Sequence, residues 1–109
     1  MPFPSLFKPF PFNHRVAQKS AELAVAITAQ VRDAVLNRAK DMDRAEARGY
    51  IRAKATPIIA RQLVLYRPQL EELDGDTLVA LAADVSERVV RMVLEDIVRL
   101  KVLANRRAA

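Results

Sequence analysis

Four basic residues in the middle of the chain have the type and spacing for anion binding. They recur every four positions and are Lys40, Arg44, Arg48 and Arg52. In a continuous helix their side chains would stack along one face, where like charges repel and a compensating anion is expected. Phosphate groups are one candidate, because contacts to a nucleic-acid backbone require Lys and Arg but no sequence-specific partner.

Two other interpretations of this basic stripe remain open. The stripe is a solvated face, or it pairs with carboxylates of another segment, namely Glu71, Glu72, Asp74 and Asp76. Aromatic residues between the basic ones, which are typical of base stacking, are limited to Tyr50. Arg106 and Arg107 form a second basic group that could serve the same roles.

Residue types for catalysis and metal binding are scarce. The chain has one His, no Cys and two Gly among its 109 residues. One His cannot form a His pair on a metal, the lack of Cys removes thiolate ligands, and two glycines are too few for a phosphate-binding loop. We therefore expect no enzymatic activity, no catalytic residue, no metal ion and no cofactor.

The longest element that must position these residues is a helix predicted from Thr77 to Arg107, a stretch without Gly or Pro. At 100° per residue its apolar side chains cover an arc of about 220°, whereas about 100° suffices for a helix on a surface. The helix should therefore be covered on two sides. Asp76 is its predicted N-cap. Asp96 falls on the apolar arc, so a basic partner from another helix is expected.

Ion pairs at i, i+4 are expected to support this long helix, each with the acid before the base. They are Asp84 with Arg88, Glu87 with Arg91, and Glu95 with Arg99.

A first helix is predicted from His14 to Asp41, with Asn13 as N-cap, in an antiparallel hairpin with the next helix. After a turn, the sequence from Asp43 to Glu46 has the pattern of a capping box. It predicts a second helix over residues 44–55. Thr56 and Pro57 resemble a further N-cap and first helical position, although a continuous helix with a kink at Pro57 is the alternative. Residues 57–66 are apolar nearly all round and are expected to be deeply buried.

Small residues beside the basic stripe allow close approach of another helix. They join the apolar positions of the long helix in the predicted packing or dimer interface, which comprises Ala45, Gly49, Ala53, Val85, Val89, Val93, Ile97 and Leu100. Ala60 continues the ridge of small residues.

Residues 1–12, MPFPSLFKPFPF, contain all four Phe and four of the six Pro. Proline removes N–H donors and favours extended backbone, so this segment is predicted to be a semi-rigid arm. Its anchors are Phe3, Phe7, Phe10 and Phe12, each worth about 1.5–3 kcal/mol when fully buried. The arm is expected to lie across the helices of its own chain or of a dimer partner. A membrane surface or a partner protein is the alternative.

Together these features predict an all-α protein. Residues 13–109 form a single bundle of three to four helices with a long C-terminal helix, and residues 1–12 form the arm. Many apolar residues are Ala, which bury little area, so we expect a dimer to complete the core. The absence of a long apolar run and of a secretory signal favours a soluble, cytoplasmic protein.

Charge and composition favour an interaction protein. The net charge of +5 is distributed as +2 over residues 1–37, +4 over 38–61, −5 over 62–98 and +4 over 99–109. Such blocks can complement one another between two copies of the chain. The predicted function is a self-associating structural, scaffolding or regulatory module. The alternatives are a dimeric DNA-binding or nucleoid-associated protein that uses the basic stripe, and a peripheral membrane protein anchored by the arm.

Overall fold

Three α-helices and one short 3₁₀-helix account for most of the chain. The computed structural model describes residues 14–108, with side chains described as far as residue 107. The elements are α2 (His14–Ala39), α3 (Arg44–Leu65), η1 (Arg67–Leu70) and α4 (Gly75–Ala108). The described part of the chain contains no strand, which confirms the all-α class. Asn13 and the arm, including its four Phe, lie outside the described residues.

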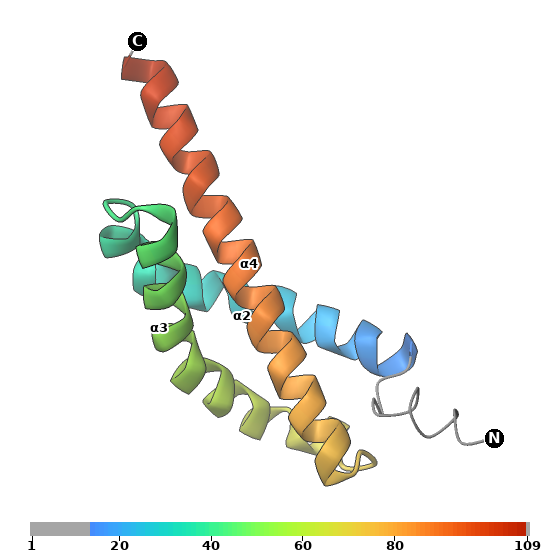
Figure 1. Ribbon diagram of the computed structural model, residues 1–109. Helices are drawn as coiled ribbons and strands as arrows, with labels where there is room; N and C mark the ends of the chain where they lie inside the picture. The colour runs from blue at the N-terminus through green and yellow to red at the C-terminus, as the bar shows by residue number, and fades with distance from the viewer. Residues whose placement is uncertain (1–13, 109) are drawn as a thin grey trace, which may run out of the picture.

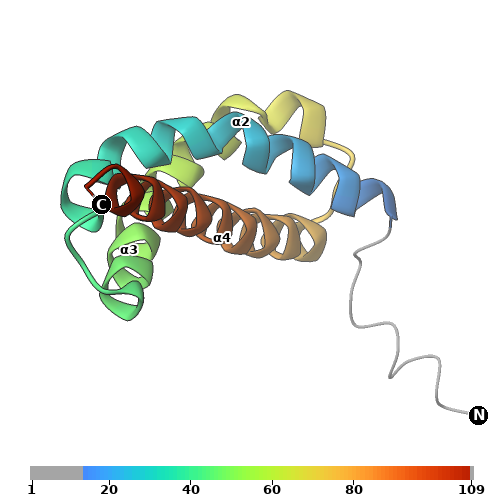
Figure 2. The ribbon, with the colours of Figure 1, turned by 90° about the horizontal axis from the view of Figure 1, so that it is seen from above.

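The three α-helices form a bundle in which α2 and α4 run in the same direction and α3 runs back (Figures 1 and 2). Each pair of helices is in contact. The turn between α2 and α3 is short, so these two helices form the predicted antiparallel hairpin. The long C-terminal helix is also confirmed, and its last turns extend past the other two helices (Figure 1).

The core lies around the middle of α4. Val85, Val89 and Val93 are completely buried, and the neighbouring Val90 and Leu94 are buried too. Successive residues point about 100° apart on a helix, so adjacent buried positions mean that two sides of α4 are covered. Helices α2 and α3 provide that cover, as the width of the apolar arc predicts.

A capping box starts α3, as predicted. The Asp43 carboxylate accepts from the Glu46 backbone N–H at 2.8 Å, and the Glu46 carboxylate accepts from the Asp43 N–H at 3.4 Å. Both bonds satisfy donors that the first turn of a helix leaves free. Helix α2 ends at Ala39, two residues before the predicted end, and Lys40 therefore lies in the turn.

The predicted helix break at Thr56 is wrong, because α3 continues through Pro57. Proline has no N–H to donate to the carbonyl of Ala53, four residues earlier. Pro57 is exposed, so water can reach this turn, and the Thr56 hydroxyl donates to the Arg52 carbonyl at 2.9 Å. The ribbon of α3 changes direction along its length (Figure 1). The continuous helix through Pro57 is therefore the correct alternative.

The expected deep burial of residues 57–66 is also wrong. Ile58 and Ile59 are buried, but Val64 is 64% and Leu65 69% exposed. In this last part of α3 the other helices cover only one side. Leu70 of η1 is buried and takes part in the core instead.

Asp74, and not Asp76, caps α4. The Asp74 carboxylate accepts from the Thr77 backbone N–H at 2.8 Å, and this bond is the main reason that the pKa of Asp74 is lowered. Helix α4 already begins at Gly75, so Asp76 lies within its first turn. There its charge still complements the helix dipole.

The capping box gives a direct test of how α3 begins. Replacing Asp43 by Ala removes the side-chain acceptor, and we expect the free energy of unfolding to fall by about 1 kcal/mol. Asp41→Ala is the matched control, since Asp41 is exposed in the same turn. Urea denaturation of both variants measures the difference. Equal stabilities of the two variants would contradict the cap.

Candidate interaction surfaces

A polar seam joins α2 to α4, and its pairs share one offset in sequence. The Ser20 hydroxyl donates to the Asp84 carboxylate at 2.6 Å, and Arg32 donates to Asp96 at 3.2 Å. Between them the Thr28 hydroxyl lies 3.7 Å from the sulfur of Met92. Each pair is 64 residues apart, so the two helices run parallel with a fixed register.

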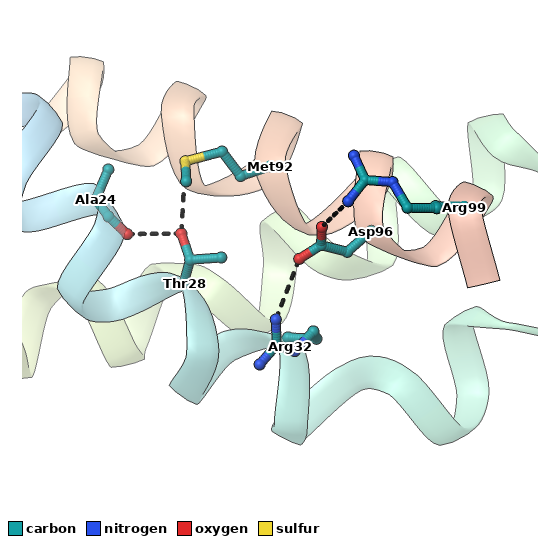
Figure 3. Close-up of polar contacts among 6 residues, drawn as sticks. All are labelled: Ala24, Thr28, Arg32, Met92, Asp96 and Arg99. Carbon is teal, nitrogen blue, oxygen red and sulfur yellow. Dashed lines mark hydrogen bonds and ion pairs between the residues drawn. The ribbon is translucent and has the colours of Figure 1, made fainter.

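The seam consists of two ridges of residues spaced by four, which is the common way for helices to interlock. The ridge of α2 is Ser20, Ala24, Thr28 and Arg32, and that of α4 is Asp84, Arg88, Met92 and Asp96. The Thr28 hydroxyl also donates to the Ala24 carbonyl at 2.6 Å (Figure 3). Thr28 is buried, and these contacts supply its polar partners.

Asp96 has the basic partner from another helix that its position on the apolar arc predicts. Arg32 reaches it from α2, and Arg99 approaches its other oxygen at 3.7 Å from within α4 (Figure 3). The side chain of Asp96 is 28% exposed, so the two cations offset the partial loss of its hydration.

Asp84 carries the strongest electrostatic signature of the seam. Its partial burial alone would raise its pKa, but hydrogen bonds from Arg88 and Ser20, and the charges of Arg88 and Arg91, lower the pKa overall. Arg88 donates to the same carboxylate oxygen as Ser20, at 2.6 Å. The predicted pair of Asp84 with Arg88 is thereby confirmed.

The other two predicted i, i+4 pairs are replaced by different partners. Glu87 pairs with Arg52 of α3 at 2.5 Å, and Arg99 pairs with Asp96 at i, i+3 in place of Glu95. The hydrogen bond from Arg52 is the main reason that the pKa of Glu87 is lowered. The partner of Glu87 lies on a neighbouring helix, so the sequence of α4 alone cannot identify it.

The predicted basic stripe is shorter than expected and faces acidic residues. Lys40 lies in the turn before α3, so only Arg44, Arg48 and Arg52 follow one face of that helix. Arg52 is paired with Glu87, whose pKa the Arg48 charge also lowers. The expected acidic partners from residues 71–76 are therefore wrong for Arg52.

At the edge of this stripe, a surface depression between α3 and α4 combines charges of both signs. It is lined by Arg44, Arg48, Glu87, Val90, Arg91, Leu94 and Glu95. The acidic residues at this surface come from α4. In the segment where acidic partners were expected, Glu72 pairs with Arg15 of α2 at 3.3 Å.

The ridge of small residues points away from the bundle. Ala45, Gly49 and Ala53 are exposed, as is Ala60, whereas the core takes Ala47 and Ala55 from the same helix. A Cβ built at Gly49 has no heavy atom within 4 Å. The ridge therefore does not pack against another of the described helices.

The remaining residues of the predicted interface fall into two groups. Val85, Val89, Val93 and Ile97 are buried inside a single chain, with 0–1% of their surface exposed. They pack in the predicted core of the bundle, so they are not available to a second copy. Leu100, the last of the set, is 44% exposed.

Leu100 and Leu103 lie on the apolar arc of α4 that the sequence pattern assigns to the core, yet each is 44% exposed. Val102, which lies outside that arc, is 44% exposed as well. Between Leu100 and Val102, Lys101 folds back and donates to the Met42 carbonyl at 2.5 Å, where the turn between α2 and α3 lies. Arg106 and Arg107 are exposed beyond this point. A helical wheel shows which side of a helix is apolar, but not where the neighbouring helices end.

A second apolar surface, which no sequence pattern indicated, lies at the opposite end of the bundle. It is a groove of about 420 Å³ where the end of α3, η1 and the start of α4 meet. Six of its eight lining residues are apolar: Leu63, Val64, Leu70, Leu73, Leu78 and Leu81. Arg67 and Glu71 complete the lining. Its residues come from three separate segments, so no single helical pattern reveals it.

The chain matches no protein-family model, no curated protein and no solved structure. In the described part of the chain, no three His, Asp or Glu side chains gather as they would to hold a metal ion. None of the helices within residues 14–108 has the length and hydropathy to cross a bilayer.

The lowered pKa of Asp84 predicts a specific acid response. Because the folded-state pKa lies below the ordinary value of 3.8, the carboxylate stabilises the fold above that pH, and this contribution is lost as the pH falls through the folded-state pKa. Asp84→Asn should cost about 1 kcal/mol at pH 7. The difference in free energy of unfolding between the wild type and Asp84→Asn should shrink as the pH falls below about 4.

Urea denaturation between neutral and acidic pH measures this difference. Asp33→Asn serves as the matched control, since Asp33 is an exposed residue of α2. The free energy of unfolding of Asp33→Asn should stay close to that of the wild type at every pH. A deficit of Asp84→Asn that does not change with pH would refute the ionised pairing of Asp84 in the seam.

Proposed function

We propose that this protein is a non-catalytic α-helical module that self-associates through the C-terminal end of α4. The observation that carries the proposal is the 44% exposure of Leu100 and Leu103 in the C-terminal part of α4. The last turns of this helix extend past its partner helices (Figure 1). Apolar patches that remain accessible on a folded chain commonly mark sites of protein interaction.

The exposed residues form a helical stripe suited to a second helix. Leu100, Leu103, Ala104 and Arg107 stand at i, i+3, i+4 and i+7, the spacing of one helix face. Val102 lies about 200° from Leu100 around the helix and faces the other way. The stripe continues from the buried face of α4, so a partner helix would extend the apolar core past the end of the bundle.

A second copy of the chain fits this stripe in the antiparallel direction. The basic Arg106 and Arg107 lie at the end of the stripe. An antiparallel pair keeps these basic ends of the two chains apart, which is favourable for like charges. A parallel pair would place the two basic ends together. The dimer is consequently a two-fold, end-to-end pair with each bundle core complete in its own chain.

The two alternatives have less support. Nucleic-acid binding would use Arg44 and Arg48, but this face is shared with Glu87 and Glu95, and Arg52 is already paired. Anchoring to a membrane would depend on the arm, which lies outside the described residues. Both stay predictions from the sequence.

Sedimentation velocity over a concentration series, from low micromolar to millimolar, tests self-association. The wild-type chain should become dimeric as concentration rises. Leu103→Glu should remain monomeric, because a dimer would bury a charge on each of the two chains. Val25→Glu is the matched control: Val25 is 64% exposed on α2, and the variant should associate like the wild type. A wild-type chain that is monomeric throughout, or equal loss of association in both variants, would overturn the proposal.

A further inference from the structure

The apolar groove at the other end of the bundle is separate from the proposed dimer surface. It lies between the last turn of α3, η1 and the first turns of α4, and its apolar lining is almost entirely leucine. Val64 on its rim is 64% exposed. An apolar groove of this kind calls for an apolar occupant.

The start of α2 lies directly beside this groove. Arg15 pairs with Glu72 at 3.3 Å, just after η1. A neighbouring depression is lined by Arg15, Val16 and Lys19 of α2 on one side and by Leu70 and Leu73 on the other. Leu70 and Leu73 also line the apolar groove. A segment that precedes His14 therefore enters the described structure next to the groove.

The chain itself supplies an apolar segment at that point. Residues 1–12 contain all four Phe, and each Phe gains about 1.5–3 kcal/mol on full burial. In the extended form that prolines favour, twelve residues span about 37 Å at roughly 3.1 Å per residue. The segment is therefore long enough to reach the groove from the start of α2.

The charges at the groove also fit this segment. Lys8 is the only charged side chain of residues 1–12, and the exposed Glu71 lines the groove. Arg67, on the same wall, offers a guanidinium that can stack on an aromatic ring. The groove thus offers leucines and Arg67 to the phenylalanines of the segment, and Glu71 to Lys8.

We propose that the groove is the docking site for residues 1–12 of the same chain. Phe side chains fill the leucine-lined groove, and Lys8 lies beside Glu71. Docking in cis is favoured over docking to a second copy. Arg15 at the start of α2 pairs with Glu72 near the groove, so the linked segment has a high effective concentration there.

Cross-linking of cysteine pairs tests this proposal in the chain of residues 1–109, which has no cysteine of its own. Ser5→Cys leaves every Phe in place and is combined either with Val64→Cys on the groove or with Val25→Cys on α2. Both valines are 64% exposed, and Val25 lies about 16 Å along α2 from His14, at 1.5 Å per residue, well within reach of the segment. A short bismaleimide cross-links the two cysteines when they come close together. Mass spectrometry of the products then shows how fast residue 5 is linked to each site.

The proposal predicts an intramolecular cross-link that forms at least severalfold faster with Val64→Cys than with Val25→Cys. Simultaneous replacement of Phe3, Phe7, Phe10 and Phe12 by Ser should remove that preference while the exposed partner positions stay unchanged. Equal rates at the two sites would overturn docking. If all cross-links were intermolecular, the segment would be docked on a second copy of the chain, and docking in cis would be overturned. Neither result depends on the dimer surface at the end of α4.

Discussion

The parallel register between α2 and α4 is the constraint on which the rest of the structure depends. An offset of 64 residues brings Ser20 to Asp84, Thr28 to Met92 and Arg32 to Asp96. If α2 moved by one turn toward the start of α4, Arg32 would face Met92 and the half-buried Asp96 would lose its partner on α2. A charge that is partly removed from water needs such a partner. These polar pairs are satisfied together in the register with an offset of 64 residues.

Helix length then determines which surfaces remain open. Helix α4 has 34 residues and α3 has 22, so α4 is longer by 12 residues, or about 18 Å at 1.5 Å per residue. The offset of 64 residues places Ala39, the last residue of α2, level with Leu103, so α2 no longer covers α4 beyond that point. Leu100 and Leu103 lie at the edge of the covered part and are each 44% exposed. At the opposite end, the bend of α3 and the short η1 leave the leucine-lined groove beside the start of α2.

Some of this architecture could be predicted from the sequence, because its causes are local. The capping box at Asp43 and the long uninterrupted helix α4 depend only on neighbouring residues, and the position of Asp96 on the apolar arc indicates a partner on another helix. Other features depend on contacts that no local pattern contains. Pro57 is accommodated within α3 because it lies on the exposed side. The small residues beside the basic stripe could equally face a neighbouring helix or solvent, and Gly49 faces solvent. The leucine-lined groove is assembled from three segments, so it exists only in the folded chain.

The contact between Thr28 and Met92 provides the most direct measurement of the register. The Thr28 hydroxyl lies 3.7 Å from the Met92 sulfur, which brings the two methyl groups close enough for a nuclear Overhauser effect. The chain has only three Met, so selective methyl labelling gives few signals to assign. The parallel register predicts a cross-peak between the Thr28 and Met92 methyl groups. A spectrum in which the Met92 methyl contacts Thr56 or Thr77, and not Thr28, would contradict the parallel register and the surfaces that follow from it.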